Sequence, residues 1–135
     1  MSNYNNIGKI ETLDYGNQIA LKIELRQVAD FEFQGCYQKA IVSLGQHTTM
    51  RGSGAPVIDR VSFEGRFAIT TGFSNNQFVL NDAKQFLKEF DSVIGLTYKL
   101  YDELLERKAK ARELEQKKAD ERKQKINDLN KFFND

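Results

Sequence analysis

The stretch that decides the fold runs from Asn81 to Asp135 and reads NDAKQFLKEFDSVIGLTYKLYDELLERKAKARELEQKKADERKQKINDLNKFFND. It contains no proline, and its last glycine is Gly95. Its second half consists mainly of Glu, Lys, Arg, Gln and Ala, which have high helix propensity. The stretch therefore predicts one long α-helix, or two helices joined near Gly95.

The first part of this predicted helix, residues 81–105, is amphipathic. Apart from Thr97, apolar side chains recur at intervals of three and four residues, namely Leu87, Phe90, Ile94, Tyr101 and Leu104, with Phe86, Val93 and Leu105 beside them. A stripe of this width is typical of a helix that packs on one face of a sheet. Asn81 or Asp82 can accept hydrogen bonds from the first turn, so we expect the helix to begin there.

Residues 106–135 form a charged extension in this interpretation. The seven-residue repeat that includes Leu104 passes through mostly charged residues before it reaches Leu129 and Phe132, so the seam of a regular coiled coil is interrupted. Acidic residues precede basic ones by four positions in the pairs Glu103–Arg107, Glu106–Lys110, Glu113–Lys117 and Glu121–Lys125. Each such pair stabilises a helix by about 0.2–0.5 kcal/mol, so together they can support an exposed helix.

An apolar patch ends the extension, and we call it the C-terminal tip. It is formed by Ile126, Leu129, Phe132 and Phe133. An exposed apolar patch at the end of a charged helix indicates a partner-binding surface, for a second subunit or for a different protein. The alternative is that this end of the helix frays.

The first eighty residues carry the period-two alternation of β-strands. Ile19, Leu21 and Ile23 alternate with small or charged residues, and turn-forming residues precede them at positions 14–17. The predicted strands are Ile7–Leu13, Ile19–Arg26, Phe31–Leu44 with a bulge at Gly35-Cys36, Val61–Thr70 and Gln77–Leu80. The predicted fold class is α+β: a five-stranded antiparallel sheet or small barrel over residues 1–80, then the amphipathic helix 81–105 and the extension 106–135.

Composition excludes several classes of protein. The 135 residues include 20 Lys and Arg against 19 Asp and Glu, so the chain lacks the bulk positive charge of a protein that coats nucleic acid. A single cysteine excludes an intrachain disulfide. The polar N-terminus lacks the apolar region of a signal peptide, and no apolar run is long enough to span a bilayer. We therefore expect a soluble, cytoplasmic protein.

The sequence predicts no catalytic residue, no metal ligand set and no cofactor. Cys36 and His47 are the only residues of their types, and metal sites need several such ligands at defined spacing. The same two residues could pair as nucleophile and base, but Cys36 falls in a predicted strand, where a cysteine is usually structural. We therefore expect a non-catalytic protein.

The segment 45–60 lacks any periodicity and is the best candidate for a ligand site. Its glycines let the backbone approach a ligand closely, its hydroxyls can donate hydrogen bonds, and its arginines can bind phosphate or carboxylate in bidentate fashion. The candidate ligand residues are His47, Thr48, Thr49, Arg51, Gly52, Ser53, Gly54 and Arg60. The spacing is not that of a P-loop, and the segment precedes a predicted strand rather than a helix.

Three functions fit these patterns. The first is a homo-oligomeric binding protein that holds a phosphate-bearing ligand, a nucleotide or nucleic acid, through residues 47–60. The second is a structural or adaptor protein whose C-terminal helix docks on a partner protein. The third is single-stranded nucleic acid binding across the sheet, where Lys22, Arg26 and Arg66 could contact phosphates beside Tyr37.

Overall fold

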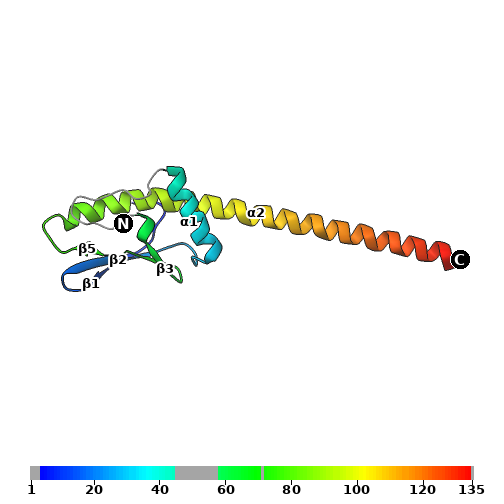
Figure 1. Ribbon diagram of the computed structural model, residues 1–135, viewed down its shortest axis with the longest axis horizontal. Coiled ribbons are helices and arrows are strands. Elements are labelled where there is room, and N and C mark those ends of the chain that lie inside the picture. Colours follow the sequence, from blue (N-terminus) through cyan, green and yellow to red (C-terminus); the bar gives the residue numbers. More distant parts are fainter. Residues whose placement is uncertain (1–3, 45–57, 71, 135) are drawn as a thin grey trace. The chain divides into compact units, whose positions relative to one another are not determined.

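The computed structural model describes residues 4–44, 58–70 and 72–134 and shows the predicted α+β fold, an antiparallel sheet followed by a long helix (Figure 1). Its elements in chain order are β1 (Ile10–Asp14), β2 (Gln18–Glu24), α1 (Phe31–Leu44), the short 3-10 helix η1 (Ile58–Arg60), β3 (Ser62–Glu64), β4 (Phe67–Ile69), β5 (Phe73–Ser74) and α2 (Val79–Asn134). The chain divides into two compact units, Met1–Tyr101 and Asp102–Asp135.

The sheet is antiparallel and open. Its five strands are arranged in the order β1-β2-β4-β3, with β5 paired to β2, so β1 and β3 are edges and the sheet is not closed into a barrel. The turn between β1 and β2 lies where the sequence predicts it, with Gly16 at a φ of 82° and its N–H donating to Asp14 Oδ1 at 2.9 Å. Pairing of Ile10 with Ile23, and of Ile23 with Ala68, builds a continuous apolar row on the face beneath the helices.

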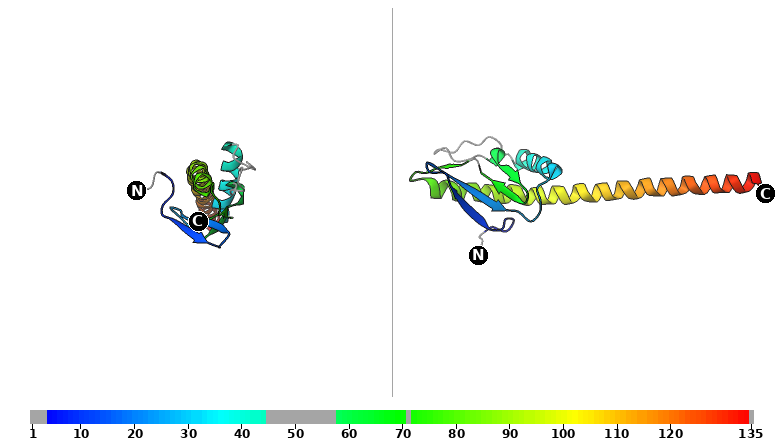
Figure 2. Two further views of the ribbon diagram at one scale, coloured as in Figure 1. Left: turned by 90° about the vertical axis from the view of Figure 1, so that its left-hand side faces the viewer. Right: turned by 90° about the horizontal axis from the view of Figure 1, so that it is seen from below.

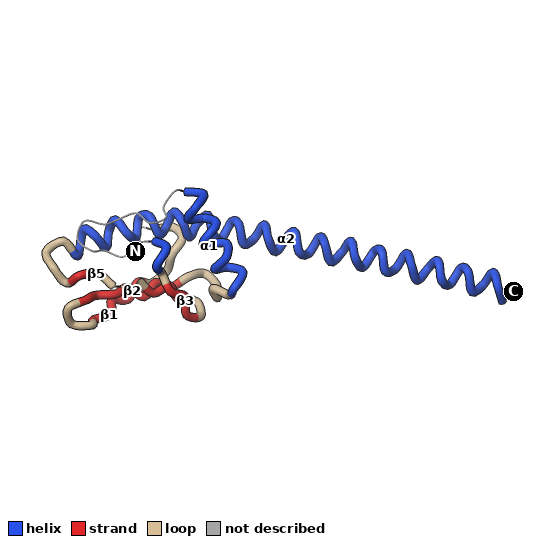
Figure 3. The backbone as a smooth tube through the Cα atoms, viewed as in Figure 1, coloured by secondary structure: helices blue, strands red, loops and turns tan. Residues whose placement is uncertain are grey.

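The prediction of a strand over Phe31–Leu44 is wrong, because these residues form helix α1 (Figure 3). The buried side chains include Phe33, Tyr37 and Ile41, which recur every four residues, a helical period. Asp30 caps the helix, since its Oδ1 accepts a hydrogen bond from the Phe33 N–H at 2.8 Å. Gly35 therefore lies within a helix and not at a β-bulge. The prediction of a strand followed the β-forming Phe, Tyr, Ile and Val residues of this segment.

Two further strand boundaries differ from the prediction. The expected single strand Val61–Thr70 is a hairpin, β3 and β4, because Gly65 adopts a φ of 59° and turns the chain back. The expected strand Gln77–Leu80 is also wrong: β5 ends at Ser74, and α2 begins at Val79. The helix thus begins before Asn81, and Asn76 Oδ1 accepts a hydrogen bond from the Phe78 N–H at 2.8 Å just ahead of it.

The first part of α2 and helix α1 lie on the same face of the sheet (Figure 2). The core contains the aromatic side chains predicted for the amphipathic stripe. Phe86 packs edge-on against Phe73 of β5 at 5.7 Å between ring centroids, and Phe90 lies 6.0 Å from Tyr37 of α1. Phe86, Phe90 and Ile94 of this helix belong to one hydrophobic core with residues of the sheet such as Ile23 and Ala68.

Helix α2 is continuous at Gly95, so the predicted alternative of two joined helices is wrong. A Cβ atom at this position would lie 2.7 Å from Asn6 Nδ2. Gly95 therefore makes room for the N-terminal segment to cross the helix, without breaking the helix itself.

In the unit Asp102–Asp135 every side chain from Ala109 to Asn134 is exposed. Of the four predicted ion pairs in this region of the described chain, the structure forms Glu106–Lys110, at 3.2 Å. Side-chain amides add two contacts of the same four-residue spacing, Gln116 to Asp120 and Gln124 to Asp128, each at 3.0 Å. Local pairs of this kind support the exposed helix.

Candidate functional site

The predicted ligand residues from His47 to Gly54 lie outside the described residues, so Arg60 is the member of that set that can be placed. It is exposed at the end of η1. The preceding Ile58 is fully buried, and its carbonyl oxygen accepts a hydrogen bond of 2.6 Å from the Tyr37 hydroxyl of α1. This contact fixes the position of η1, and with it the backbone that carries Arg60.

The nucleic acid hypothesis places Tyr37 on the outward face of the sheet. In the structure Tyr37 lies in the core and has no exposed surface. The outer face instead places Lys22 Nζ 4.4 Å from the centroid of the Phe67 ring. A shallow hollow of about 220 Å³ lies there, lined by Lys9, Glu11, Lys22, Glu24 and Phe67. Two acidic residues offset the two basic ones, so the side chains that line this hollow carry no net positive charge.

The two arginines near the sheet are held by the fold itself. Arg26 Nη2 donates to the backbone oxygen of Asn5 at 2.9 Å and to Asn6 Oδ1 at 3.3 Å. Its guanidinium lies 4.8 Å from the centroid of the Tyr98 ring. Arg66 Nη2 donates to the backbone oxygen of Arg26 at 3.1 Å. The contacts of Arg26 attach the N-terminal segment to the end of β2, and that of Arg66 ties the β3–β4 turn to Arg26, so the first role of both side chains is structural.

Two tyrosines of α2 have raised pKa values for different reasons. Burial raises the pKa of Tyr98, an effect that the hydrogen bond from the Arg26 N–H partly opposes. The Tyr101 hydroxyl donates to Asp30 Oδ2 at 2.7 Å, and this hydrogen bond to a carboxylate raises the pKa of Tyr101 to about 12. Both phenols therefore remain protonated at neutral pH.

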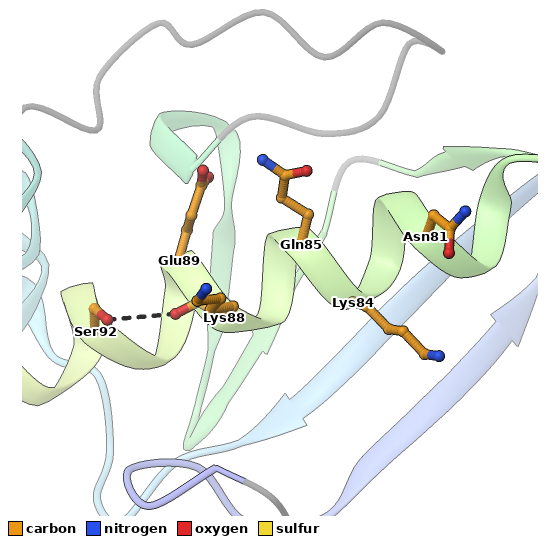
Figure 4. Close-up of a pocket in the computed structure, with 6 residues that line it drawn as sticks. All are labelled: Asn81, Lys84, Gln85, Lys88, Glu89 and Ser92. Atoms are coloured by element: carbon orange, nitrogen blue, oxygen red, sulfur yellow. Dashed lines mark hydrogen bonds between the residues drawn. The ribbon is translucent and has the colours of Figure 1, made fainter.

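A hollow of about 580 Å³ lies along one helix, α2 (Figure 4). Its lining residues are Asn81, Lys84, Gln85, Lys88, Glu89 and Ser92. Gln85 and Glu89 extend in one direction, whereas Lys84 points away from them (Figure 4). Side chains that diverge from a single helix do not converge on a ligand as those of a binding site do.

Cys36 lies in α1 and is buried, which corrects its predicted place in a strand. His47 lies outside the described residues, so the structure does not test this pair. Across residues 4–44, 58–70 and 72–134, no group of three or more His, Cys, Asp or Glu side chains could hold a metal ion. The same ranges contain no helix with both the length and the apolar character needed to cross a membrane.

Helix α1 borders a hollow that the sequence analysis did not predict. Phe31 is 89% exposed and lies beside a hollow of about 270 Å³. The other lining residues are Gln34, Gly35, Gln38, Val61 and Phe63. Assigning Phe31–Leu44 to a helix would have placed Phe31, Gln34, Gly35 and Gln38 on one side of it, because they are spaced three and four residues apart.

The four side chains of the C-terminal tip lie on α2 and are all exposed, with Phe132 at 79% and Phe133 at 73%. The rings of these two residues are 5.5 Å apart. Leu105 and Leu114 of the same unit are also exposed. The unit Asp102–Asp135 thus presents apolar surface near both of its ends.

No protein-family model matches the chain, and no curated protein or solved structure matches it either. The functional conclusion therefore rests on the surfaces described above.

Proposed function

We propose that this chain is a non-catalytic assembly protein that works as a homo-oligomer, and that residues 102–134 of α2 are its association element. The observation that supports this proposal is the exposed tip, in which two adjacent phenylalanines project from a helix that is otherwise highly charged. Burying a large apolar side chain contributes about 1.5–3 kcal/mol, so covering the tip would stabilise an assembly. Exposed aromatic side chains of this kind are typical anchors of protein interfaces.

The experiment is a mass measurement by light scattering on the full chain and on a variant that ends after Leu105. The full chain is expected to be oligomeric and the shortened chain monomeric. Because truncation can disturb folding, the full-length variant with Phe132→Gln and Phe133→Gln is measured beside it, with circular dichroism to check that the helix is intact. If the full chain is monomeric, self-association is wrong, and a different protein becomes the expected partner of the tip.

Ligand binding by residues 47–60 is a second candidate. The supporting observation is that Arg60 is exposed on a backbone that the Tyr37–Ile58 contact anchors. If this site holds a phosphate-bearing ligand, nucleotides should raise the melting temperature of the wild type, and Arg51→Ala or Arg60→Ala should abolish the increase. A wild type that no nucleotide stabilises would contradict this role.

A further inference from the structure

We infer that residues 104–133 of α2 pair with the same segment of a second copy in the antiparallel direction, about a two-fold axis between Lys118 and Ala119. This inference rests on the proposed self-association and adds the partner, the direction and the register. It concerns the unit Asp102–Asp135, which is helical through Asn134.

Two series of residues on one side of this helix follow a seven-residue repeat. The first series is Leu104, Lys108, Ala111, Glu115 and Lys118, and the second is Ala119, Arg122, Ile126, Leu129 and Phe133. Between Lys118 and Ala119 the repeat shifts by four residues, which is a known irregularity of coiled coils that unwinds them locally. With this one change of phase the seven-residue repeat continues from Leu104 to Phe133.

The two series are mirror images of each other in their spacing. The intervals in the first are four, three, four and three residues, and those in the second are three, four, three and four. An antiparallel pair about the stated axis therefore brings the first series of one copy level with the second series of the other. The resulting layers are Leu104–Phe133, Lys108–Leu129, Ala111–Ile126, Glu115–Arg122 and Lys118–Ala119.

Charge decides the direction of pairing. In the antiparallel pair Glu115 of each copy lies opposite Arg122 of the other, so two layers carry opposite charges. A parallel pair in register would instead place Glu115 against Glu115 and Arg122 against Arg122, and Lys108 would face Lys108. Like charges that face each other in a desolvated layer strongly destabilise an interface. Glu115 and Arg122 thus favour the antiparallel direction, because a parallel pair in register would set each of them against its own charge.

Side-chain size agrees with the same register. Ala111 lies opposite the larger Ile126, and Leu104 lies opposite Phe133, so the layers at both ends are apolar. Lys108 can pack its aliphatic stem on Leu129 while its ammonium group reaches water. Leu105 and Phe132, both exposed in the single chain, flank the outermost layers. The apolar side chains near the two ends of the unit therefore lie in the outermost layers or beside them.

The first test exchanges the charges of the central layers in the full-length protein. Glu115→Arg places two arginines together in each layer and Arg122→Glu places two glutamates together, so each variant is expected to dissociate about 10-fold more readily or worse. The double variant restores opposite charges and should return to within about 3-fold of the wild type. Glu113→Arg and Lys117→Glu are matched controls, because they change charge equally on the far side of the helix.

The second test measures distances between spin labels on two copies, with Cys36→Ala in the background. Labels on Gln116→Cys lie about 8 Å apart along the axis in the antiparallel pair, whereas labels on Asn127→Cys lie about 26 Å apart, at 1.5 Å per residue. A parallel pair in register has no axial offset at either position. Cysteine at exposed positions leaves the seam itself unchanged.

The outcomes separate the two proposals. A wild type that is monomeric at every concentration overturns both the antiparallel pair and the proposed self-association. An oligomeric wild type whose double charge variant remains as weak as the single variants overturns the antiparallel register and leaves self-association standing. Equally short distances at positions 116 and 127 would likewise show a parallel pair.

Discussion

Asn6 binds Asp91 at two points, and both bonds lie where the N-terminal segment crosses α2. The backbone N–H of Asn6 donates to Asp91 Oδ1 at 2.9 Å, and Asn6 Nδ2 donates to the carbonyl oxygen of Asp91 at 3.1 Å. The absence of a side chain at Gly95, one turn further along the helix, makes this crossing possible. A glycine that lowers helix propensity is thus used for packing between segments distant in sequence.

Alanine at Gly95 should destabilise the protein by about 1 kcal/mol, although alanine is the better helix former. The added Cβ would displace the Asn6 side chain and break its bond to Asp91. Gly35→Ala is the matched control, because nothing lies within 4 Å of a Cβ there, and it should stabilise α1 by about 0.5–1 kcal/mol. Urea denaturation measures both changes. Equal effects at the two glycines would contradict the crossing contact.

Asp30 joins the start of α1 to α2. Replacing Asp30 should therefore lower the free energy of unfolding more than removing the Tyr101 hydroxyl does. Asp30→Ala loses both the helix cap and the bond to Tyr101, with an expected cost of about 1–2 kcal/mol. Asp30→Ser can keep the cap and should cost less. In the Asp30→Ala background Tyr101→Phe should have little further effect on the free energy of unfolding. Additive costs in this double-mutant cycle would show that the two residues do not interact.

The same contact predicts a dependence of stability on alkaline pH. The pKa of Tyr101 is raised from 10.0 to about 12 in the folded protein, so folding favours the protonated phenol. This contribution to stability is complete below pH 10 and is lost as the pH rises toward 12. Because the pKa values of Tyr98 and Tyr101 are both raised, an ultraviolet titration of Tyr101→Phe should lack one of the late-ionising tyrosines of the wild type. An identical titration curve for the variant would contradict the assignment.

The hydroxyl of Tyr37 should be worth about 1–3 kcal/mol, because its removal leaves the buried carbonyl oxygen of Ile58 without this donor. Tyr37→Phe is therefore expected to lower the free energy of unfolding by that amount. Tyr15→Phe, at an exposed position in the β1–β2 turn, is the control and should have almost no effect. Thermal or urea denaturation of the two variants provides the comparison, and equal stability would contradict the role given to Tyr37.

Local patterns were sufficient to predict the elements whose side chains follow one clear period. The alternation of Ile19, Leu21 and Ile23 predicted β2, and the turn residues before it predicted the hairpin with β1. The stripe that includes Phe90 and Ile94 predicted the buried face of α2. These predictions hold because local backbone preference and tertiary burial favour the same structure at those positions.

Only the tertiary structure decided the elements whose local signals conflict. Phe31–Leu44 contains many β-forming residues. It is nevertheless a helix, because the helical period places both Phe33 and Tyr37 in the core. The prediction placed Tyr37 on an open face for the same reason. Gly65 and Gly95 illustrate the same ambiguity: one turns a hairpin, and the other sits in a continuous helix beneath Asn6.

The sequence by itself determined the long charged helix, its apolar tip and the mirrored spacing about Lys118 and Ala119, because these depend on helical period and charge alone. The tertiary structure decided where α2 is buried and where it is exposed. The last anchoring contact of the buried part is that of Tyr101, whose hydroxyl donates to Asp30. Further along the helix, every side chain from Ala109 to Asn134 is exposed. Burial depends on which segments meet in space, and residues far apart in the sequence set that outcome jointly.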